Sequence, residues 1–364
     1  MRMSCPAAFR IEPNRVWRTY LGGRTLDEIS GAEHPEDSHF PEDWMVSTTL
    51  AKNVGREYLA TEGLSSLSSS GNGTRFLSEW LELFPVEILG KRHLARFGKS
   101  AGFLLKYLDS SIRLHMQCHP TVSFSRHFLN SEHGKSEGYL ILGSRPEVDP
   151  YIYLGFQHLP ERAFFRKAVL EQDEKALLSC FEKIPVRPGD VFFVPGGFPH
   201  AIGEGIFMIE IMEPSDFAVR IEFERGGYVL PEQARFMGRD VDFALSMFEF
   251  RERSVEEIRH EQFVLPRRLP LTGEGERFSL FDSRYTNCFR VELVRIHGVA
   301  NLEHDGFRVL VVTEGEGVVY AGKETLGLKR FDRVLIPHWI DSIRLESRRG
   351  MTLAVARPPE TENL

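Results

Sequence analysis

A ten-residue stretch near the middle of the chain, VRPGDVFFVP at residues 186–195, decides the fold, and it has a counterpart in LKRFDRVLIP at residues 328–337. Each copy places an Asp in a turn, follows it with a β-prone run and ends on Pro, which is typical of a short strand between turns. Short strands punctuated by Gly and Pro favour an antiparallel sandwich or barrel over alternating βαβ units. Two copies in two β-rich halves indicate two jelly-roll domains.

The rest of the chain predicts a mainly β protein with added helices. We expect strands over residues 112–118, 138–142, 191–194, 207–212 and 219–223, and again over 290–296, 308–313, 317–320, 333–336 and 352–356. Apolar residues at helical spacing predict helices over about 75–84 with Thr74 as the cap, over about 160–181 with a break at Gln172-Asp173, and over about 232–250. Residues 25–75 lack periodicity, and we expect the serine-rich part at 65–73 to be an exposed loop.

The composition is that of an ordinary globular protein. Of 364 residues, 42% are hydrophobic and 27% are charged, which excludes a disordered, fibrous or disulfide-stapled chain. The formal net charge of −7 is the opposite of the basic surface that nucleic acids and anionic membranes attract, so we expect neither as a partner. Four widely spaced cysteines, no leader-like apolar run and no stretch of about 20 apolar residues predict a cytoplasmic protein that does not span a membrane.

The segment LHMQCHP at residues 114–120 carries the first candidate ligands. On an extended strand His115, Gln117 and His119 share one face, because residues two apart project the same way. Such a face also fits the polar outer side of a sandwich; Glu137, taken alone, fits a solvated carboxylate, and His200 fits a loop histidine bound to backbone. The four side chains that together would offer carbonyl, imidazole and carboxylate donors to one divalent ion, with room left for water or substrate, are Gln117, His119, Glu137 and His200.

Several segments resemble type I mannose-6-phosphate isomerases, the zinc-dependent cupin family. FLLKYLD at residues 103–109 is similar to the family's PLLxKxLDA segment, QCHP at 117–120 to its QVHP, and KSE at 135–137 to its K-P/T-E. GDVFFVPGG at 189–197, continued by HAIG at 200–203, EI at 210–211, SD at 215–216 and Arg220, follows the family's longest motif without a gap. The resemblance covers about residues 100–225 and is only architectural after about residue 260.

This resemblance implies a fold, a metal and a set of site residues. The fold is two cupin domains of jelly-roll β-sandwich or barrel form with additional helical segments: residues 1–226 form the metal-binding domain with helical insertions at about 75–98 and 160–182, 227–262 a helical linker, and 263–364 a degenerate cupin without a metal site. The metal is one divalent ion, zinc by the family's pattern. Its implied ligands are Gln117, His119, Glu137 and His200, the implied catalytic residues are Arg220 and Lys135, and the expected substrate-binding residues are Lys106, His115 and Glu210.

The implied reaction interconverts mannose 6-phosphate and fructose 6-phosphate through a cis-enediol. It needs a base beside a carbonyl whose oxygens a divalent ion polarises. The candidate bases are a metal-bound water, Lys135, His115 and Glu210, and Lys135 is our first candidate. Arg220 would bind either the phosphate or the enediolate oxygen. Structural alternatives stay open here: Arg220 paired with Asp216 or Glu222, Lys106 paired with Asp109, and Lys135 on the surface.

Some departures from the family pattern keep other functions in view. His115 stands where the family commonly has Ser, and Glu222-Phe223-Glu224 replaces Tyr-Asp-Trp. These changes leave room for an isomerase of another sugar or sugar phosphate, or for a sugar-sensing cupin without turnover. An iron oxygenase fits less well, because Glu137 lies 18 residues after His119 and Gln117 takes the place of the first His. We expect a hexose phosphate as the substrate, and a monomer or homodimer.

Overall fold

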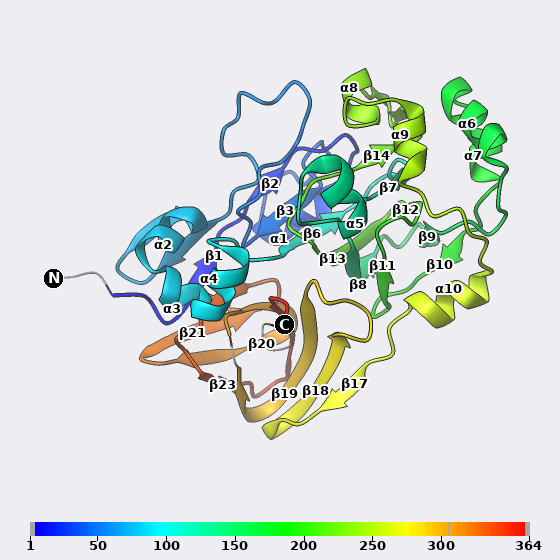
Figure 1. Ribbon diagram of the computed structural model, residues 1–364. Helices are drawn as coiled ribbons and strands as arrows, with labels where there is room; N and C mark the ends of the chain where they lie inside the picture. Colours follow the sequence, from blue (N-terminus) through cyan, green and yellow to red (C-terminus); the bar gives the residue numbers. More distant parts are fainter. Residues whose placement is uncertain (1–3, 305, 361–364) are drawn as a thin grey trace.

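The N-terminal half is built from two antiparallel sheets in a computed structural model that describes residues 4–304 and 306–360 (Figure 1). One sheet has the order β11-β8-β13-β6-β3-β2 and the other the order β10-β9-β12-β7-β14. The strands of the first sheet are β2 (Arg15–Val16), β3 (Glu42–Met45), β6 (Leu104–Asp109), β8 (Glu137–Ser144), β11 (Val191–Val194) and β13 (Ile206–Met212), and those of the second are β7 (Gln117–Cys118), β9 (Tyr151–Leu154), β10 (Ile184–Pro185), β12 (His200–Ile202) and β14 (Val219–Arg220).

Apolar side chains from both sheets share one core, so the two sheets lie face to face as in a jelly roll. Leu108, Ile141 and Met208 from the first sheet pack with Ile152 and Ile202 from the second. Each of these side chains is almost fully buried. Because side chains alternate along a strand, the same inner faces also present polar groups toward the space between the sheets.

The C-terminal half is a closed antiparallel barrel. Its strands are β17 (Arg267–Leu269), β18 (Thr272–Phe281), β19 (Arg290–Glu303), β20 (Arg308–Ala321), β21 (Glu324–Lys329), β22 (Arg333–Ile336), β23 (Ser342–Glu346) and β24 (Met351–Arg357). Closure follows from pairing, because β19 and β20 each pair with both β23 and β24. Val294, Leu310 and Leu353 are among the buried residues that fill this barrel.

The N-terminal segment belongs to the C-terminal sheet. Strand β1 (Phe9–Ile11) pairs with β22 on one side and with β4 (Ser66–Ser69) on the other, and β4 pairs with β5 (Gly73–Phe76). Strands β1, β4 and β5 from the first half of the chain therefore extend the sheet of the second half. The domain boundaries predicted at residues 226 and 263 stay predictions.

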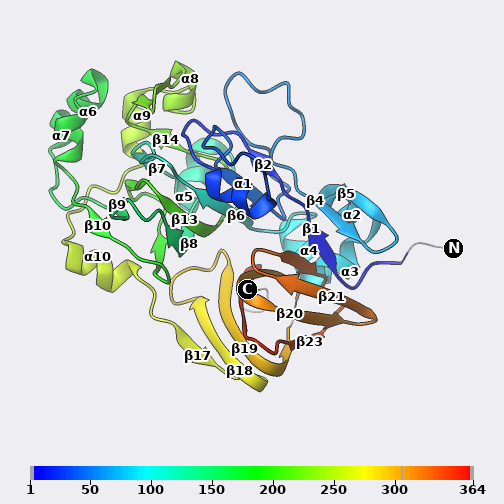
Figure 2. The ribbon, with the colours of Figure 1, turned by 180° about the vertical axis from the view of Figure 1, so that it is seen from behind.

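Helices cover the outside of the five-stranded sheet and fill the junction between the halves. The helical segments are α1 (Arg24–Ser30), α2 (Leu77–Leu83), α3 (Pro85–Leu89), α4 (Lys91–Phe97), α5 (Val122–Phe124), η1 (Ser125–Leu129), α6 (Arg162–Glu171), α7 (Glu174–Leu178), α8 (Glu232–Arg235), α9 (Val241–Ser246) and α10 (Val255–Gln262), and a short hairpin joins β15 (Glu224–Arg225) to β16 (Tyr228–Val229). Phe165 of α6 and Leu245 of α9 share a core with Cys118 and Val219 of the sheet. Both views place α6 to α9 on the side away from the C-terminal strands (Figures 1 and 2).

The predicted mainly β fold class and both copies of the repeated strand are confirmed, since residues 191–194 form β11 and 333–336 form β22. The break predicted at Gln172-Asp173 is also confirmed, because Gln172 has φ 53° and the Asp173 side chain caps α7. The predicted strands 308–313 and 317–320 are a single strand, β20. The strand predicted over 112–118 is reduced to β7, and that over 219–223 to β14.

Three local predictions were wrong. The serine-rich residues 65–73, expected to be a loop, form most of the β4–β5 hairpin, because the sheet edge at β1 supplies a pairing partner that composition does not reveal. Thr74 lies in β5, and the helix begins after Phe76, whose N–H donates to Glu79. The helix expected over about 232–250 is two, α8 and α9, because Met237 and Gly238 adopt positive φ between them. Among the described residues, the helices are too short or too polar to span a membrane.

A buried ion pair between the halves provides a test of their packing. Arg333 of β22 donates to Asp43 of β3 at 2.7 Å and to the carbonyl of Ile11 at 3.2 Å. Because Arg333→Met leaves the Asp43 carboxylate buried without its cation, we expect the free energy of unfolding to fall by about 3–5 kcal/mol. Urea unfolding followed by tryptophan fluorescence measures the change. The control Arg349→Met, which removes an exposed partner of Glu316, should cost less than about 1 kcal/mol, and equal losses would contradict the prediction.

A buried histidine predicts a specific pH dependence of stability. Burial lowers the pKa of His93 in α4 from 6.5 to about 4, and its Nε2 lies 2.7 Å from the Ser100 carbonyl oxygen. The unfolded chain therefore takes up a proton first as the pH falls below 6.5, and stability present at neutral pH is lost. We expect this residue to lower the free energy of unfolding by about 2 kcal/mol between pH 7.5 and pH 5.

The matched variant for this prediction is His93→Gln, which keeps an amide donor toward Ser100 but does not titrate. Urea unfolding of both proteins at the two pH values should show a smaller pH dependence in the variant. An unchanged pH dependence would mean that other groups account for the acid sensitivity of the fold.

Candidate metal centre

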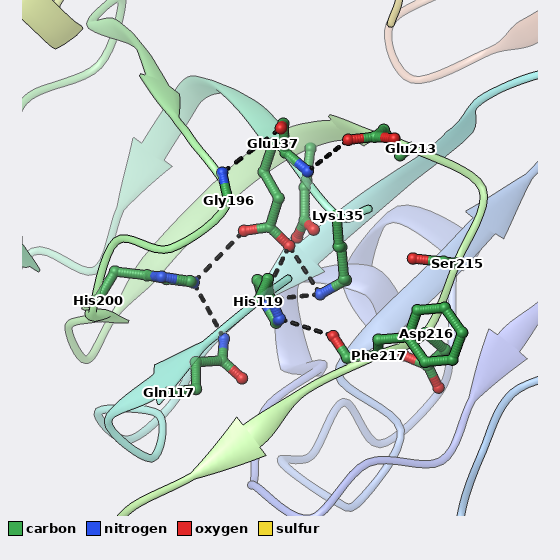
Figure 3. Close-up of polar contacts among 12 residues, drawn as sticks. Gln117, His119, Lys135, Glu137, Gly196, His200, Glu213, Ser215, Asp216 and Phe217 are labelled. Atoms are coloured by element: carbon green, nitrogen blue, oxygen red, sulfur yellow. Dashed lines mark hydrogen bonds and ion pairs between the residues drawn. The ribbon is translucent and has the colours of Figure 1, made fainter. Parts of the chain in front are cut away.

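Three buried donor side chains meet where the two N-terminal sheets face each other. His119 follows β7, Glu137 begins β8 and His200 begins β12, and one ligand atom from each lies within 4.8 Å of the others. His119 Nε2 is 3.2 Å from Glu137 Oε1, and His200 Nε2 is 3.4 Å from Glu137 Oε2. Figure 3 shows the two rings and the carboxylate pointing toward one another. The predicted convergence of these residues is therefore present in the structure.

Backbone carbonyls orient both imidazole rings. His119 Nδ1 lies 2.8 Å from the Phe217 carbonyl oxygen, and His200 Nδ1 lies 2.9 Å from that of Phe198. Each Nδ1 therefore carries the proton and donates it, which leaves the Nε2 lone pair facing Glu137. This is the tautomer that a metal-binding histidine needs.

The protonation states also suit a cation. Burial lowers the pKa of His119 to about 3, and the neighbouring Lys135 ammonium adds to the effect. Burial alone would raise the pKa of Glu137, but Lys135 and His119 outweigh it and hold that pKa well below its usual range. Near neutral pH the site thus presents neutral His119 and an ionised Glu137 carboxylate. Nitrogen and oxygen donors of this kind match a divalent ion such as zinc.

The fourth predicted ligand, Gln117, joins the cluster from β7. Its Nε2 lies 3.4 Å from His200 Nε2, and its backbone pairs with His200 across β7 and β12. A half-turn of the carboxamide places the oxygen where the nitrogen now lies, so Gln117 can offer an oxygen to the same point.

Lys135 is buried beside the donors, so the surface alternative for this lysine was wrong. Its Nζ lies 2.7 Å from Glu137 Oε1 and 2.9 Å from His119 Nε2 (Figure 3). An ammonium group held by two of the proposed ligands shows that this point of the interior favours a positive charge. A divalent cation therefore fits the donor set.

A small, partly enclosed cavity adjoins the cluster and is walled by charged side chains. Lys106 Nζ pairs with Glu42 at 3.2 Å and with Glu210 at 3.1 Å, so its expected alternative partner Asp109 was wrong. Arg18 pairs with Glu42 at 3.3 Å and with Asp216 at 2.8 Å. The residues that line the cavity include Arg18, Tyr20, Glu42, Lys106, His115, Gln117, Lys135, Glu137, Tyr139, Glu210 and Arg220.

Two of these side chains keep an unpartnered polar atom in the interior. Within the described chain, Glu210 Oε1 and His115 Nε2 are buried without a hydrogen-bond partner. Burial raises the pKa of Glu210 to about 8, with Lys106 opposing the rise and Glu137 adding to it. Burial lowers the pKa of His115 to about 4, and its Nδ1 lies 2.9 Å from the Glu222 carbonyl oxygen. The His115 nitrogen is free to accept a hydrogen bond from a ligand, and the Glu210 oxygen is free to accept one when ionised or to donate one when protonated.

Arg220 is a half-buried cation without an ion-pair partner in the part of the chain that the structure describes. Its Nη1 donates to the Ala234 carbonyl at 3.3 Å, and burial, reinforced by Arg18, lowers its pKa to about 10. The expected alternative partners are taken by other cations, since Asp216 binds Arg18 and Glu222 binds Arg113. Arg220 is therefore available to an anionic ligand.

Sequence reasoning missed part of this wall. Arg18, Glu42 and Tyr139 come from segments without a recognisable motif, and Glu42 accepts hydrogen bonds from Tyr20 and Trp44. The one signal in the sequence was the pair of acidic residues beside Trp44 and Met45 in residues 42–45. Their partners lie far away in sequence, so no local spacing could pair them.

Comparison with known proteins gives relatives of one kind. No protein-family model matches the chain. A curated mannose-6-phosphate isomerase of Bacillus subtilis is 27% identical over 274 residues, which cover 72% of this chain and 79% of that protein. A second, from Streptococcus mutans, is 28% identical over 264 residues, which cover 71% of this chain and 76% of that protein.

Solved structures agree in fold. The crystal structure of the mannose 6-phosphate isomerase from Bacillus subtilis has a TM-score of 0.74 at 18% identity and covers 97% of this chain and 100% of that chain. A variant of phosphomannose isomerase from Salmonella typhimurium has a TM-score of 0.70 at 14% identity, covering 98% and 100%. A mannose 6-phosphate isomerase bound with zinc and yttrium has a TM-score of 0.68 at 14% identity, covering 97% and 100%. The predicted resemblance and cupin fold are thereby confirmed.

The donor cluster predicts that the protein binds one divalent ion per chain. Among the described residues, Glu137 supplies the only carboxylate of the group formed with His119 and His200. Glu137→Gln should therefore weaken Zn²⁺ binding by at least about 100-fold, and His119→Ala should do the same. Isothermal titration of chelator-treated protein with Zn²⁺, together with metal analysis, measures the affinity and stoichiometry. The exposed His127→Ala is the control, and full affinity in Glu137→Gln would show that the ion binds elsewhere.

Proposed function

We propose that this protein is a metal-dependent aldose–ketose isomerase that interconverts mannose 6-phosphate and fructose 6-phosphate. The observation that carries the proposal is the convergence of His119, Glu137 and His200 beside a partly enclosed, charged cavity. The curated relatives of this chain, named mannose-6-phosphate isomerases, support the substrate. Four cysteines without disulfide bonds fit a reducing cytoplasm, and we keep a monomer or a homodimer as the assembly.

Zinc is the metal we propose, held by His119, Glu137, His200 and the Gln117 oxygen. When bound, the ion supplies Lewis-acid polarisation of the sugar's carbonyl and hydroxyl oxygens, which makes the neighbouring carbon acidic. Two imidazoles, a carboxylate and a carboxamide give this site borderline-soft donors with room for substrate oxygens.

Lys135 is the residue we propose for proton transfer. Its Nζ lies within 2.9 Å of His119 Nε2 and 2.7 Å of Glu137 Oε1, and so lies beside any carbon presented to the cluster. A lysine acts as a general base through its neutral amine, which accepts the proton from the substrate carbon. Arg220 then balances the negative charge that develops on the substrate, since no carboxylate in the described chain pairs with it.

The substrate's hydroxyl groups find acceptors on the remaining walls. Glu210 Oε1 and His115 Nε2 each have an unused lone pair, and Lys106 holds Glu210 through an ion pair at 3.1 Å. These three residues are proposed to bind and orient the sugar. A ligand without hydroxyl groups would leave these buried polar atoms unpaired and would bind more weakly. The cavity therefore selects for a polyhydroxylated ligand.

A coupled assay for fructose 6-phosphate formed from mannose 6-phosphate tests the proposal. We expect turnover that chelation of the protein abolishes and Zn²⁺ restores. Because Arg220 stabilises developing charge, Arg220→Gln should lower kcat by about 100-fold, whereas the exposed Arg349→Gln should leave it unchanged.

Two results would lead elsewhere. Zinc-dependent turnover of a different hexose or hexose phosphate would keep the isomerase and replace its substrate. Ligand binding without turnover of any sugar in the panel would instead favour a sugar-sensing cupin.

A further inference from the structure

A second cavity of about 560 Å³ lies next to the one beside the metal donors. Ala218 and Arg220 line both cavities, so only these two residues need separate the outer cavity from the one beside the metal donors. Its walls come from the loop at residues 50–60, from Leu129 at the end of η1, and from residues 233–237 in and after α8. A ligand that reaches the donors through Arg220 therefore passes this loop.

Lys52 brings an uncompensated positive charge to the outer cavity. Its Nζ lies 4.5 Å from the centre of the Phe217 ring, and no ion pair involves it among the residues that the structure describes. Arg56, on the same loop, is different, because its guanidinium is neutralised by Glu62 at 2.8 Å. The lining carboxylate of Glu57 accepts from the N–H of Gly55.

Two backbone contacts fix Lys52 relative to the metal centre. Its N–H donates to Asp216 Oδ2 at 2.8 Å, and Asp216 is itself held by Arg18. The next residue, Phe217, uses its carbonyl to orient the ligand His119 while its ring supports the Lys52 ammonium. Figure 3 shows the Phe217 carbonyl directed at His119 and the ring on the side away from the cluster. Phe217 therefore links Lys52 to His119, one of the proposed metal ligands.

We propose that Lys52 binds the phosphate group of the substrate in the outer cavity and so determines the preference for phosphorylated sugars. An ammonium group on a flexible side chain pairs readily with a phosphate. Lys52 forms no ion pair among the described residues, so no such contact must break before a phosphate binds. Arg220 lies between the two cavities, so a phosphate at Lys52 leaves the sugar's reacting carbons toward the donors. This inference rests on the proposed function for the identity of the sugar.

The test compares Lys52→Gln with Lys52→Arg and with Lys323→Gln, a control in the β20–β21 turn. The backbone N–H that binds Asp216 is kept in every variant, so the loop keeps its anchor. For Lys52→Gln we expect KM for mannose 6-phosphate to rise about tenfold with kcat within about twofold, because a charge-assisted contact to the unreactive end is lost. Lys52→Arg should restore most of the affinity, and kcat/KM for unphosphorylated mannose should not change.

Calorimetric titration of the zinc-loaded protein with inorganic phosphate tests the role of Lys52 separately from the proposed isomerase activity. If no sugar is turned over but phosphate binds more weakly to Lys52→Gln, the isomerase proposal fails and the phosphate site stands. If mannose 6-phosphate is isomerised with the same KM, and phosphate binds with the same affinity in Lys52→Gln, the role of Lys52 is overturned. A fall in kcat with unchanged KM would also overturn it.

Discussion

The ionised carboxylate of Glu137 in a dry interior is the constraint on which the rest of the site depends. A buried anion is stable only when cations and donors surround it, and here the Lys135 ammonium and the Tyr139 hydroxyl do so, with the two neutral imidazoles beside them. Lys135 and Tyr139 lie two residues either side of Glu137 along its own chain segment, whereas the two imidazoles come from the opposite sheet, where one strand could not have placed them. The meeting of two sheets at this point is therefore both the architecture of the jelly roll and the condition for the site.

The same rule extends outward through the wall of the partly enclosed cavity. Lys106, Arg18, Glu42, Glu210 and Asp216 alternate in sign, and nearly every charge faces an opposite one. Arg220, Glu210 Oε1 and His115 Nε2 are exceptions, and each faces the cavity. In a network that is otherwise satisfied, these unpaired groups mark where a ligand completes the bonding. The outer faces of the sheets, packed against helices and the second barrel, keep this arrangement rigid.

Sequence patterns predicted the parts of the molecule that are local. Period-2 runs identified the strands that carry Glu137 and the repeated unit, and the HxQxH alternation brought Gln117 and His119 to one side. The pairing of Lys106 with Glu42 and Glu210 could not be predicted, because it is decided by neighbouring strands β3, β6 and β13 rather than by spacing along the chain. For the same reason the serine-rich hairpin was missed: its polar strands are stabilised by an edge that another part of the chain supplies.

The position of β1 has a consequence for how the molecule is made. Phe9 and Arg10 pair with Leu335 and Val334, so strand β1 leaves the ribosome more than 300 residues before its partner β22. Until the final barrel strands emerge, the strand edge formed by β1 and β4 lacks a neighbour on one side and must be kept from pairing with other chains. Synthesis from the amino to the carboxyl end thus completes the segment that carries the metal donors before β1 can pair with β22, and this pairing is a late event that closes a long loop.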